Sequence, residues 1–325
     1  MKFASLNKGP DGQILLVSRD LQWAITIPGV GPNLRDILDQ WEKLSPSIEE
    51  GYQHLNAGEW NDAIHFDPAC CTAPLPRASQ WLKDSSSLQS HELESPPGGQ
   101  AISKRPDQQP QMYRGCSDNL LGPREDITGK VSWGVDFQAS IAVITDRVPM
   151  GCTVEDAHKY IRLVTLCNDI TMRNLIPGEL STGLGLIHSK PYSSFSPVAV
   201  TPDELGDHWQ DGRLNLDIRI SFNDTLFGGA NRASQVRFNF HEMIACAATT
   251  RHLSCGTVIS ADPVSGIAGG TLECFSLAEQ MRLKALRQGA SGTDYMQEGD
   301  RVKMEILDPD GQSIFGAIEQ TLRVI

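Results

Sequence analysis

Apolar and polar residues alternate at the start of the segment VDFQASIAVIT, residues 135–145. This period of two predicts a β-strand, which becomes wholly apolar in its second half. Val135, Phe137, Ala139 and Ile141 share one face, and the other face carries the polar residues Asp136, Gln138 and Ser140. This polar row either faces solvent or lines a site.

Similar patterns predict elements in the first part of the chain. QILLVS and WAITIP indicate two short strands around a polar turn. PNLRDILDQWEKL predicts a helix that begins after Asn33 and is interrupted by the sequence SPS at residues 45–47. Residues 84–110 hold almost no aliphatic side chains and are rich in Ser, Pro, Gly and Gln, which predicts a long surface loop.

Longer strands are predicted after about residue 120. LNLDIRISFN is one, and DRVKMEIL turns through residues 308–311 into SIFGAIEQTLRVI as a hairpin. One helix is predicted from Thr153 through AHKYIRLVTL to Asn168. A second is predicted in FNFHEMIACAATTRHL, because apolar residues recur there at helical spacing, namely Phe240, Met243, Ile244 and Ala247. The fold class is therefore α+β and mostly β, with two domains expected.

Composition narrows the class of partner. The 325 residues carry a net charge of -12, and no basic stripe is present that could displace counterions from nucleic acid. No apolar run approaches the roughly 20 residues that span a membrane, and the first residues lack a signal-peptide core. We expect a cytoplasmic protein with a small-molecule substrate. The eight cysteines are spread widely, which predicts reduced thiols.

No phosphate-binding glycine loop, nucleophile elbow or His-Glu-x-x-His pair is present. The candidate chemistry lies instead in polar residues at the predicted ends of elements, namely Asp84, His91, Asp169, Lys190 and Glu279. Each of these residues taken alone is more typical of a turn or a solvated side chain.

Several sequence blocks nevertheless resemble the bacterial branch of the fumarylacetoacetate hydrolase family. These blocks are APLPRASQW, SDNLLGPRED, WGVDF, VPMG, RNLIPGEL, FSPVAVTPDELG and GQSIFGAIEQ, and they keep family order and spacing over nearly the whole chain. The resemblance implies a small N-terminal barrel-like domain, residues 1–118, and a larger C-terminal mixed β-roll, residues 119–325. It also implies a homodimer.

Members of that family act on 1,3-dicarbonyl or acylpyruvate compounds with a bound Mg²⁺ or Ca²⁺ and a histidine that a glutamate orients. By resemblance, Asp84 and Asp169 are metal ligands, and His91, seven residues after Asp84, is the water-activating base. Glu279 matches the glutamate that orients this histidine. Lys190 and Tyr113 match residues that contact the substrate.

The strand 135–145 departs from the family pattern. Where the bacterial branch has Asp-Phe-Glu-x-Glu, with both glutamates binding the metal, this chain has Gln138 and Ser140. A slip by two residues would put Asp136 in place of the first glutamate and would keep the face, although the shared Asp-Phe opposes it. We therefore expect either no cofactor or a weakly bound Mg²⁺ or Ca²⁺, with Gln138 and Ser140 facing the substrate.

Two further departures concern the substrate. HELESPPGGQAIS has no Lys or Arg before Lys104, where the family has basic residues, so a less anionic or bulkier substrate is expected. The family's Gly-Ser-Gly-Thr turn has no counterpart within CGTVISADPVSGIAGG, and no role is carried over to residues 256–273.

Three functions remain open. The first is an ordinary metal-dependent hydrolase of an acylpyruvate. The second, which we favour, is an enzyme with weakened or no metal dependence, in which His91 and Glu279 transfer protons during tautomerisation, cyclisation, dehydration or carbon–carbon cleavage of a β-dicarbonyl. A role in specialised biosynthesis fits this option. The third is a non-catalytic binding protein on the same fold.

Overall fold

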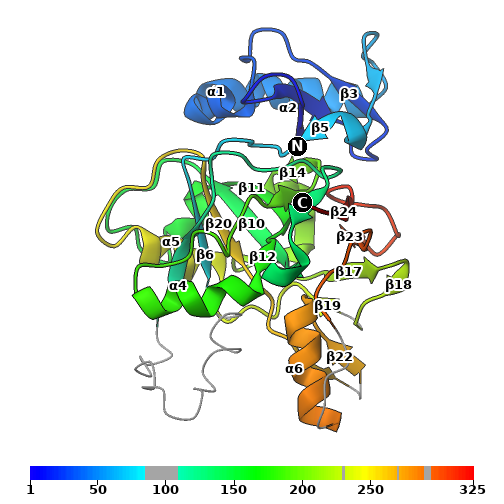
Figure 1. Cartoon of the computed structure of the whole chain (residues 1–325). Helices are drawn as coiled ribbons and strands as arrows, with labels where there is room; N and C mark the ends of the chain where they lie inside the picture. Colours follow the sequence, from blue (N-terminus) through cyan, green and yellow to red (C-terminus); the bar gives the residue numbers. More distant parts are fainter. Residues whose placement is uncertain (85–108, 229–230, 269–270, 289–293) are drawn as a thin grey trace.

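A computed structural model describes residues 1–84, 109–228, 231–268, 271–288 and 294–325 (Figure 1). The predicted loop at 84–110, and His91 with it, falls mostly outside these ranges. Within them, strands outnumber helices and form mixed sheets, so the α+β, mostly β prediction is confirmed.

The N-terminal part combines a sheet edge with two helices, at the top of Figure 1. Asn33 caps the first helix by accepting a hydrogen bond from the backbone N–H of Asp36, as the sequence predicted. The predicted break at residues 45–47 is wrong, because the second helix begins at Trp41 and continues through Pro46. The elements are β1 (Lys2–Leu6), β2 (Gln13–Val17), β3 (Trp23–Ile25), α1 (Leu34–Asp39), α2 (Trp41–Asn56), β4 (Ile64–His65), η1 (Pro68–Cys70) and β5 (Cys71–Thr72).

The largest sheet joins this part to the centre of the molecule. Its strand order is β4-β3-β2-β1-β14-β11-β10-β20-β6-β7, with β13 beside β11 and β5 beside β1. β20 and β6 run parallel, and the other pairs described in this sheet are antiparallel. Its remaining strands are β6 (Gln80–Asp84), β7 (Met112–Gly115), β10 (Ala139–Thr145), β11 (Ile161–Asn168), β13 (Ser194–Phe195), β14 (Val198–Val200) and β20 (Thr257–Ala261).

The helix predicted from Thr153 to Asn168 is wrong. Thr153 does accept a hydrogen bond from the backbone N–H of Asp156, at 3.2 Å, but only the short helix η3 (Ala157–Tyr160) follows. Residues 161–168 form β11, which lies between β10 and β14 and has apolar side chains buried on both faces. A run that is apolar on both faces has no strand alternation, so periodicity did not separate it from a buried helix.

A second sheet, of order β18-β17-β23-β24-β8 with β19 beside β17, lies to the right in Figure 1. The predicted C-terminal hairpin is confirmed, because β23 and β24 pair antiparallel and Gly311 adopts a φ of 83° in the turn. Its strands are β8 (Ile127–Gly129), β17 (Asp217–Phe222), β18 (Thr225–Leu226), β19 (Asn231–Arg232), β23 (Arg301–Ile306) and β24 (Ile318–Val324).

The other elements connect or cover the two sheets. The predicted helix around residue 240 is confirmed as α5, and its four apolar residues at helical spacing are all buried. These elements are η2 (Val131–Trp133), β9 (Val135–Asp136), β12 (Thr171–Met172), η4 (Arg173–Leu175), α4 (Ile176–Thr182), η5 (Pro202–His208), β15 (Trp209–Gln210), β16 (Arg213–Leu214), α5 (Phe240–Ala247), β21 (Gly266–Ala268), β22 (Thr271–Glu273) and α6 (Leu277–Gln288).

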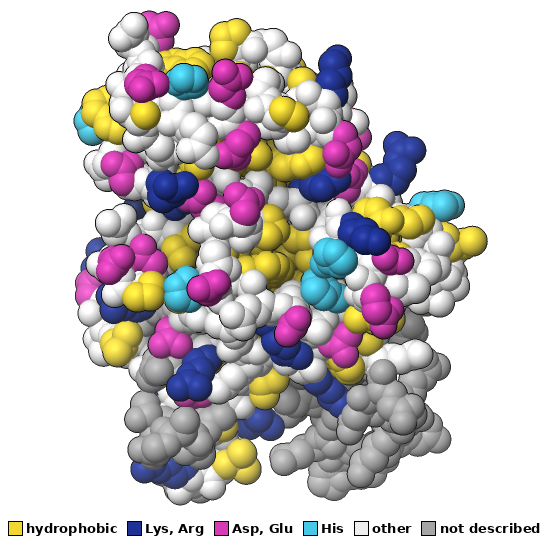
Figure 2. Space-filling view, turned by 180° about the vertical axis from the view of Figure 1, so that it is seen from behind, with side chains coloured by type: hydrophobic (Ala, Val, Ile, Leu, Met, Phe, Trp, Pro, Cys, Tyr) yellow, Lys and Arg dark blue, Asp and Glu magenta, His cyan; other side chains and the backbone are white. Residues whose placement is uncertain are grey.

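The surface fits the composition. Basic and acidic side chains are interspersed on the face shown in Figure 2, rather than gathered by sign. In the part of the chain that the structure describes, every helix is too short or too polar to cross a bilayer. All eight cysteines are free thiols.

Candidate active site

The strand with the alternating pattern contributes both to the core and to the site. Its apolar face, which includes Val135 and Phe137, is buried in the core beside the second sheet. The polar row of Asp136, Gln138 and Ser140 is also buried, with each residue at most 1% exposed. The row is therefore not a solvated outer face, and each of its side chains has a polar partner within the protein.

Sheet register brings one polar residue from each of four adjacent strands to the same end of the sheet. Ser140 of β10 pairs with Cys167 of β11, so Asp169, just past the end of β11, lies diagonal to Ser140. On the other side of β10, Ile141 pairs with Ala261 of β20, which places Asp262 next to Ser140. The β20–β6 pairing then sets Lys83 of β6 opposite Ser260.

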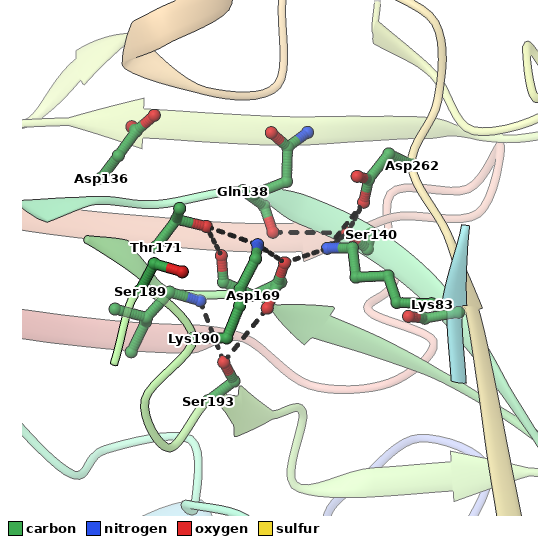
Figure 3. Close-up of polar contacts among 12 residues, drawn as sticks. Lys83, Asp136, Gln138, Ser140, Asp169, Thr171, Ser189, Lys190, Ser193 and Asp262 are labelled. Carbon is green, nitrogen blue, oxygen red and sulfur yellow. Dashed lines mark hydrogen bonds and ion pairs between the residues drawn. The ribbon is translucent and has the colours of Figure 1, made fainter. Parts of the chain in front are cut away.

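Lys83 lies at the centre of this group. Its ammonium contacts Asp169, lies 2.9 Å from Asp262 Oδ1, and donates to Ser140 Oγ at 3.3 Å (Figure 3). Burial alone would lower the pKa of Lys83, but the Asp169 and Asp262 carboxylates outweigh it and raise that pKa above its ordinary value. We call Lys83, Ser140, Asp169 and Asp262 the Lys83 cluster.

Asp169 also binds a second ammonium. Lys190 Nζ donates to Asp169 Oδ2 at 2.6 Å and to Thr171 Oγ1 at 2.7 Å. Burial lowers the pKa of Lys190 to about 8, with Asp169 opposing the shift. Burial would raise the pKa of Asp169, but Lys190 and Lys83 outweigh it and lower the value to about 2. The Asp169 carboxylate is therefore ionised at neutral pH.

Tyr113 of β7 borders the same group. It pairs directly with Lys83, its hydroxyl donates to Asp169 Oδ2 at 3.5 Å, and its ring centroid lies 5.3 Å from Lys190 Nζ. The sequence-predicted residues Tyr113, Asp169 and Lys190 thus lie together in the fold.

Asp136 lies outside the Lys83 cluster and contacts Arg173 and the N-terminus of α6. Its Oδ2 accepts a hydrogen bond from Arg173 Nε at 2.9 Å, and its carboxylate accepts from the backbone N–H groups of Leu277 and Ala278 in the first turn of α6. A carboxylate at a helix N-terminus is favourably placed for the helix dipole. A guanidinium and two N–H groups thus occupy the Asp136 carboxylate, which disfavours the slipped register with Asp136 in place of a metal-binding glutamate.

Gln138 has one satisfied and one unsatisfied polar atom. Its Oε1 accepts from Arg173 Nη2 at 3.2 Å, whereas its buried Nε2 has no hydrogen-bond partner among the described residues. An unpaired buried N–H donor is costly. Such a donor is suited to the carbonyl oxygen of a bound molecule.

Glu279 lies in the first turn of α6, close in space to Arg173. Its Oε2 accepts from the backbone N–H of Phe275 at 2.8 Å, while its own N–H donates to Ser276 Oγ at 3.2 Å. Burial raises the pKa of Glu279 to about 7, although the bond from Phe275 opposes that shift. A carboxyl group with this pKa can accept or donate a proton near neutral pH.

The carboxylates of the site do not fit a divalent cation. Mg²⁺ or Ca²⁺ needs about six or more oxygen ligands at about 2.0–2.6 Å. Among the described residues, however, no three His, Cys, Asp or Glu side chains are grouped as a metal site requires. Lys83 forms ion pairs with both Asp169 and Asp262, and Gln138 Oε1 accepts a hydrogen bond from Arg173. Asp84, the other predicted metal ligand, is buried at the end of β6. The residue before it, Lys83, contacts Asp169.

No sequence pattern predicted three charged members of the site, namely Lys83, Arg173 and Asp262. The available signal for Lys83 was its position directly after the apolar pair Trp81 and Leu82 in the strand QWLKD, because a lysine buried in a strand requires an anionic partner. His91, the predicted base, lies outside the described residues.

Comparison with known families identifies the chain. Residues 1–77 match the model described as Fumarylacetoacetase N-terminal domain 2, and residues 85–323 match Fumarylacetoacetate (FAA) hydrolase C-terminal. The chain belongs to the FAA hydrolase family. A curated relative, an uncharacterised protein of Methanocaldococcus jannaschii, is 24% identical over 161 residues, which are 48% of this chain and 61% of that protein.

Solved FAA hydrolase folds align over the whole chain at low identity. Fumarylacetoacetate hydrolase from Exiguobacterium antarcticum is 14% identical with a TM-score of 0.65, covering 100% of both chains. Maleylpyruvate hydrolase from Sphingobium sp. SYK-6, in complex with manganese(II) and pyruvate, is 16% identical with a TM-score of 0.62, covering 100% of this chain and 99% of that one. These likenesses confirm the fold.

Proposed function

We propose that this FAA hydrolase family member is an enzyme that acts on a small β-dicarbonyl compound, such as a 1,3-diketone or an acylpyruvate, without requiring a tightly bound metal. The observation that carries the proposal is the buried amide N–H of Gln138, which has no partner among the described residues and lies beside the Arg173 guanidinium. A carbonyl or enolate oxygen would satisfy that donor, and a buried cation nearby would stabilise the negative charge.

The remaining side chains support proton transfer on such a compound. A β-dicarbonyl exchanges the proton on its central carbon through an enolate, so an enzyme needs a base for that proton and donors for the oxygens. Glu279, with a pKa of about 7, can hold the proton, and Lys190 can donate to the second oxygen. The predicted base His91 would share the proton transfer with Glu279.

Family membership supports the substrate class. The structural neighbours include a maleylpyruvate hydrolase and a fumarylacetoacetate hydrolase, whose names denote an acylpyruvate and a 1,3-diketone respectively. Analysis of the products distinguishes tautomerisation, cyclisation, dehydration and carbon–carbon cleavage.

The test is a panel of acylpyruvates and 1,3-diketones incubated with the protein in D₂O. Proton NMR then follows both exchange at the central carbon and product formation, each with and without a chelator. We expect exchange or turnover that survives chelation and that falls in Gln138→Leu. Turnover abolished by chelation and restored by Mg²⁺ would favour the ordinary metal-dependent hydrolase instead.

A second variant separates an enzyme from a binding protein. His91→Ala is expected to abolish turnover while the protein still binds the substrate. If no compound of the panel shows exchange or turnover with the wild-type protein, the proposal fails.

A further inference from the structure

The ammonium of Lys83 is enclosed by acceptors from three other segments. An ammonium group has three N–H donors. Here the three acceptors are Asp169 at the end of β11, Asp262 at the end of β20, and Ser140 of β10 (Figure 3). Lys83 is only 1% exposed, and a buried ammonium needs partners for its N–H donors. The three acceptors match its three donors.

Ser140 completes the arrangement from the opposite side. Its hydroxyl donates to Asp262 Oδ1, the same oxygen that lies 2.9 Å from Lys83 Nζ. The hydroxyl therefore accepts from the lysine and donates to the aspartate, which closes a ring of polar contacts. A glutamate at this position would add a third carboxylate to the group, whereas serine keeps it at two carboxylates around one ammonium.

A divalent ion and the Lys83 ammonium would compete for the same space. Bound to both Asp169 and Asp262, the ion would have to lie within about 2.0–2.6 Å of their oxygens, between the two carboxylates. Lys83 Nζ already occupies that position. Lys190, 2.6 Å from Asp169 Oδ2, adds further repulsion against a second cation.

We propose that Lys83 is the resident cation of this site, a covalently attached positive charge that stands in place of a divalent metal. Its single positive charge offsets part of the negative charge of Asp169 and Asp262 and fixes the positions of both carboxylates. The inference rests on the proposed function only in placing the cluster at the substrate pocket. Its test measures metal binding, so its failure can be told apart from failure of the proposed reaction.

The experiment titrates purified protein with MnCl₂ and measures free Mn²⁺ by electron paramagnetic resonance. The wild-type protein is expected to bind no stoichiometric Mn²⁺. Lys83→Met and Lys83→Gln remove the positive charge between Asp169 and Asp262, and each is expected to bind one Mn²⁺ per chain at least about tenfold more tightly than the wild type. The glutamine variant keeps an N–H donor for Asp169 or Asp262, which protects the fold.

Two controls locate the effect. Lys190→Met also removes an ammonium from Asp169 but retains Lys83. This variant is therefore expected to bind no stoichiometric Mn²⁺, like the wild type. The double variant Lys83→Met with Asp262→Asn removes one of the freed carboxylates and is expected to lose the gained affinity. A variant that folds only when Mn²⁺ is added would also support the proposal.

Stoichiometric Mn²⁺ binding by the wild-type protein would overturn the proposal. So would Lys83→Gln binding Mn²⁺ no better than the wild type, or Lys190→Met gaining as much affinity as the Lys83 variants.

Discussion

Arg173 Nε lies 2.9 Å from Asp136 Oδ2, and both side chains are buried. This pair ties the strand segment β9 to the N-terminus of α6, because Asp136 also accepts from two backbone N–H groups of that helix. Asp136→Asn would remove the carboxylate that pairs directly with the buried guanidinium. We expect the free energy of unfolding to fall by about 3–5 kcal/mol, measured by urea denaturation.

A matched control is the surface pair of Asp11 and Arg77, both of which are partly or largely exposed. Asp11→Asn should leave the denaturation midpoint almost unchanged. The double variant of Asp136→Asn with Arg173→Met should recover stability relative to Asp136→Asn alone. If Asp136→Asn is as stable as Asp11→Asn, the pair does not anchor α6.

Glu279 predicts a pH dependence of stability. Its pKa is raised from 4.5 to about 7 in the folded protein, so the unfolded chain loses its proton first as the pH rises. The wild-type protein should therefore lose stability between about pH 4.5 and 7, by up to about 3 kcal/mol from this group. The charged groups that influence Glu279 are Arg173, Asp136 and Asp262.

Glu279→Gln removes this titration while keeping the side-chain shape. Urea denaturation of both proteins from pH 4.5 to 8 should show the variant gaining relative stability as the pH rises. Parallel curves for the two proteins would mean that Glu279 is ionised in the folded state throughout this range.

Lys190→Met tests the second carbonyl donor. On a β-dicarbonyl that the wild type turns over, we expect kcat/KM to fall by about 10²- to 10³-fold, as when one donor to a developing oxyanion is lost. Asp169 keeps Lys83 as a partner, so the variant should fold. Lys159→Met, at an exposed lysine that pairs with exposed Asp156, is the control and should retain wild-type kinetics.

Pro46 lies inside α2 and is exposed. A proline in a helix interior costs a hydrogen bond relative to alanine, although it also restricts the unfolded chain. Pro46→Ala should therefore raise the free energy of unfolding by about 1–3 kcal/mol. Glu50→Ala, also at an exposed position of α2, is the control. A loss of stability in Pro46→Ala would indicate that the proline packs favourably where it lies.

Local patterns were sufficient for the elements with one exposed face. The Asn33 cap, the hairpin through residues 308–311 and the apolar face of α5 were all predicted from spacing and turn chemistry. β11 was not, because burial on both faces removes the alternation that distinguishes a strand. Pro46 was predicted to break the helix because proline has a low helix propensity. The packing of the buried face of α2 against the rest of the protein stabilises the helix, and the local sequence does not show that packing.

The site was predictable only in part for a related reason. Resemblance indicated Tyr113, Asp169 and Lys190, which the fold brings together. Lys83 and Asp262 were not predicted as site residues because only their ion pair places them in the site. The two residues of that pair are far apart in the sequence. Asp262 also lies in a stretch where the family pattern is lost, so resemblance carried no role to it.

The parallel contact between β6 and β20 has a consequence for the order of folding. Trp81 of β6 donates to Ser260 of β20, which is 179 residues away, and this bond lies two residues along each segment from the Lys83–Asp262 pair. Contacts between such distant segments form slowly, because a long loop must close first. Until β6 and β20 pair, Lys83 and Asp262 stay hydrated and apart, so their buried ion pair forms only as the sheet is completed.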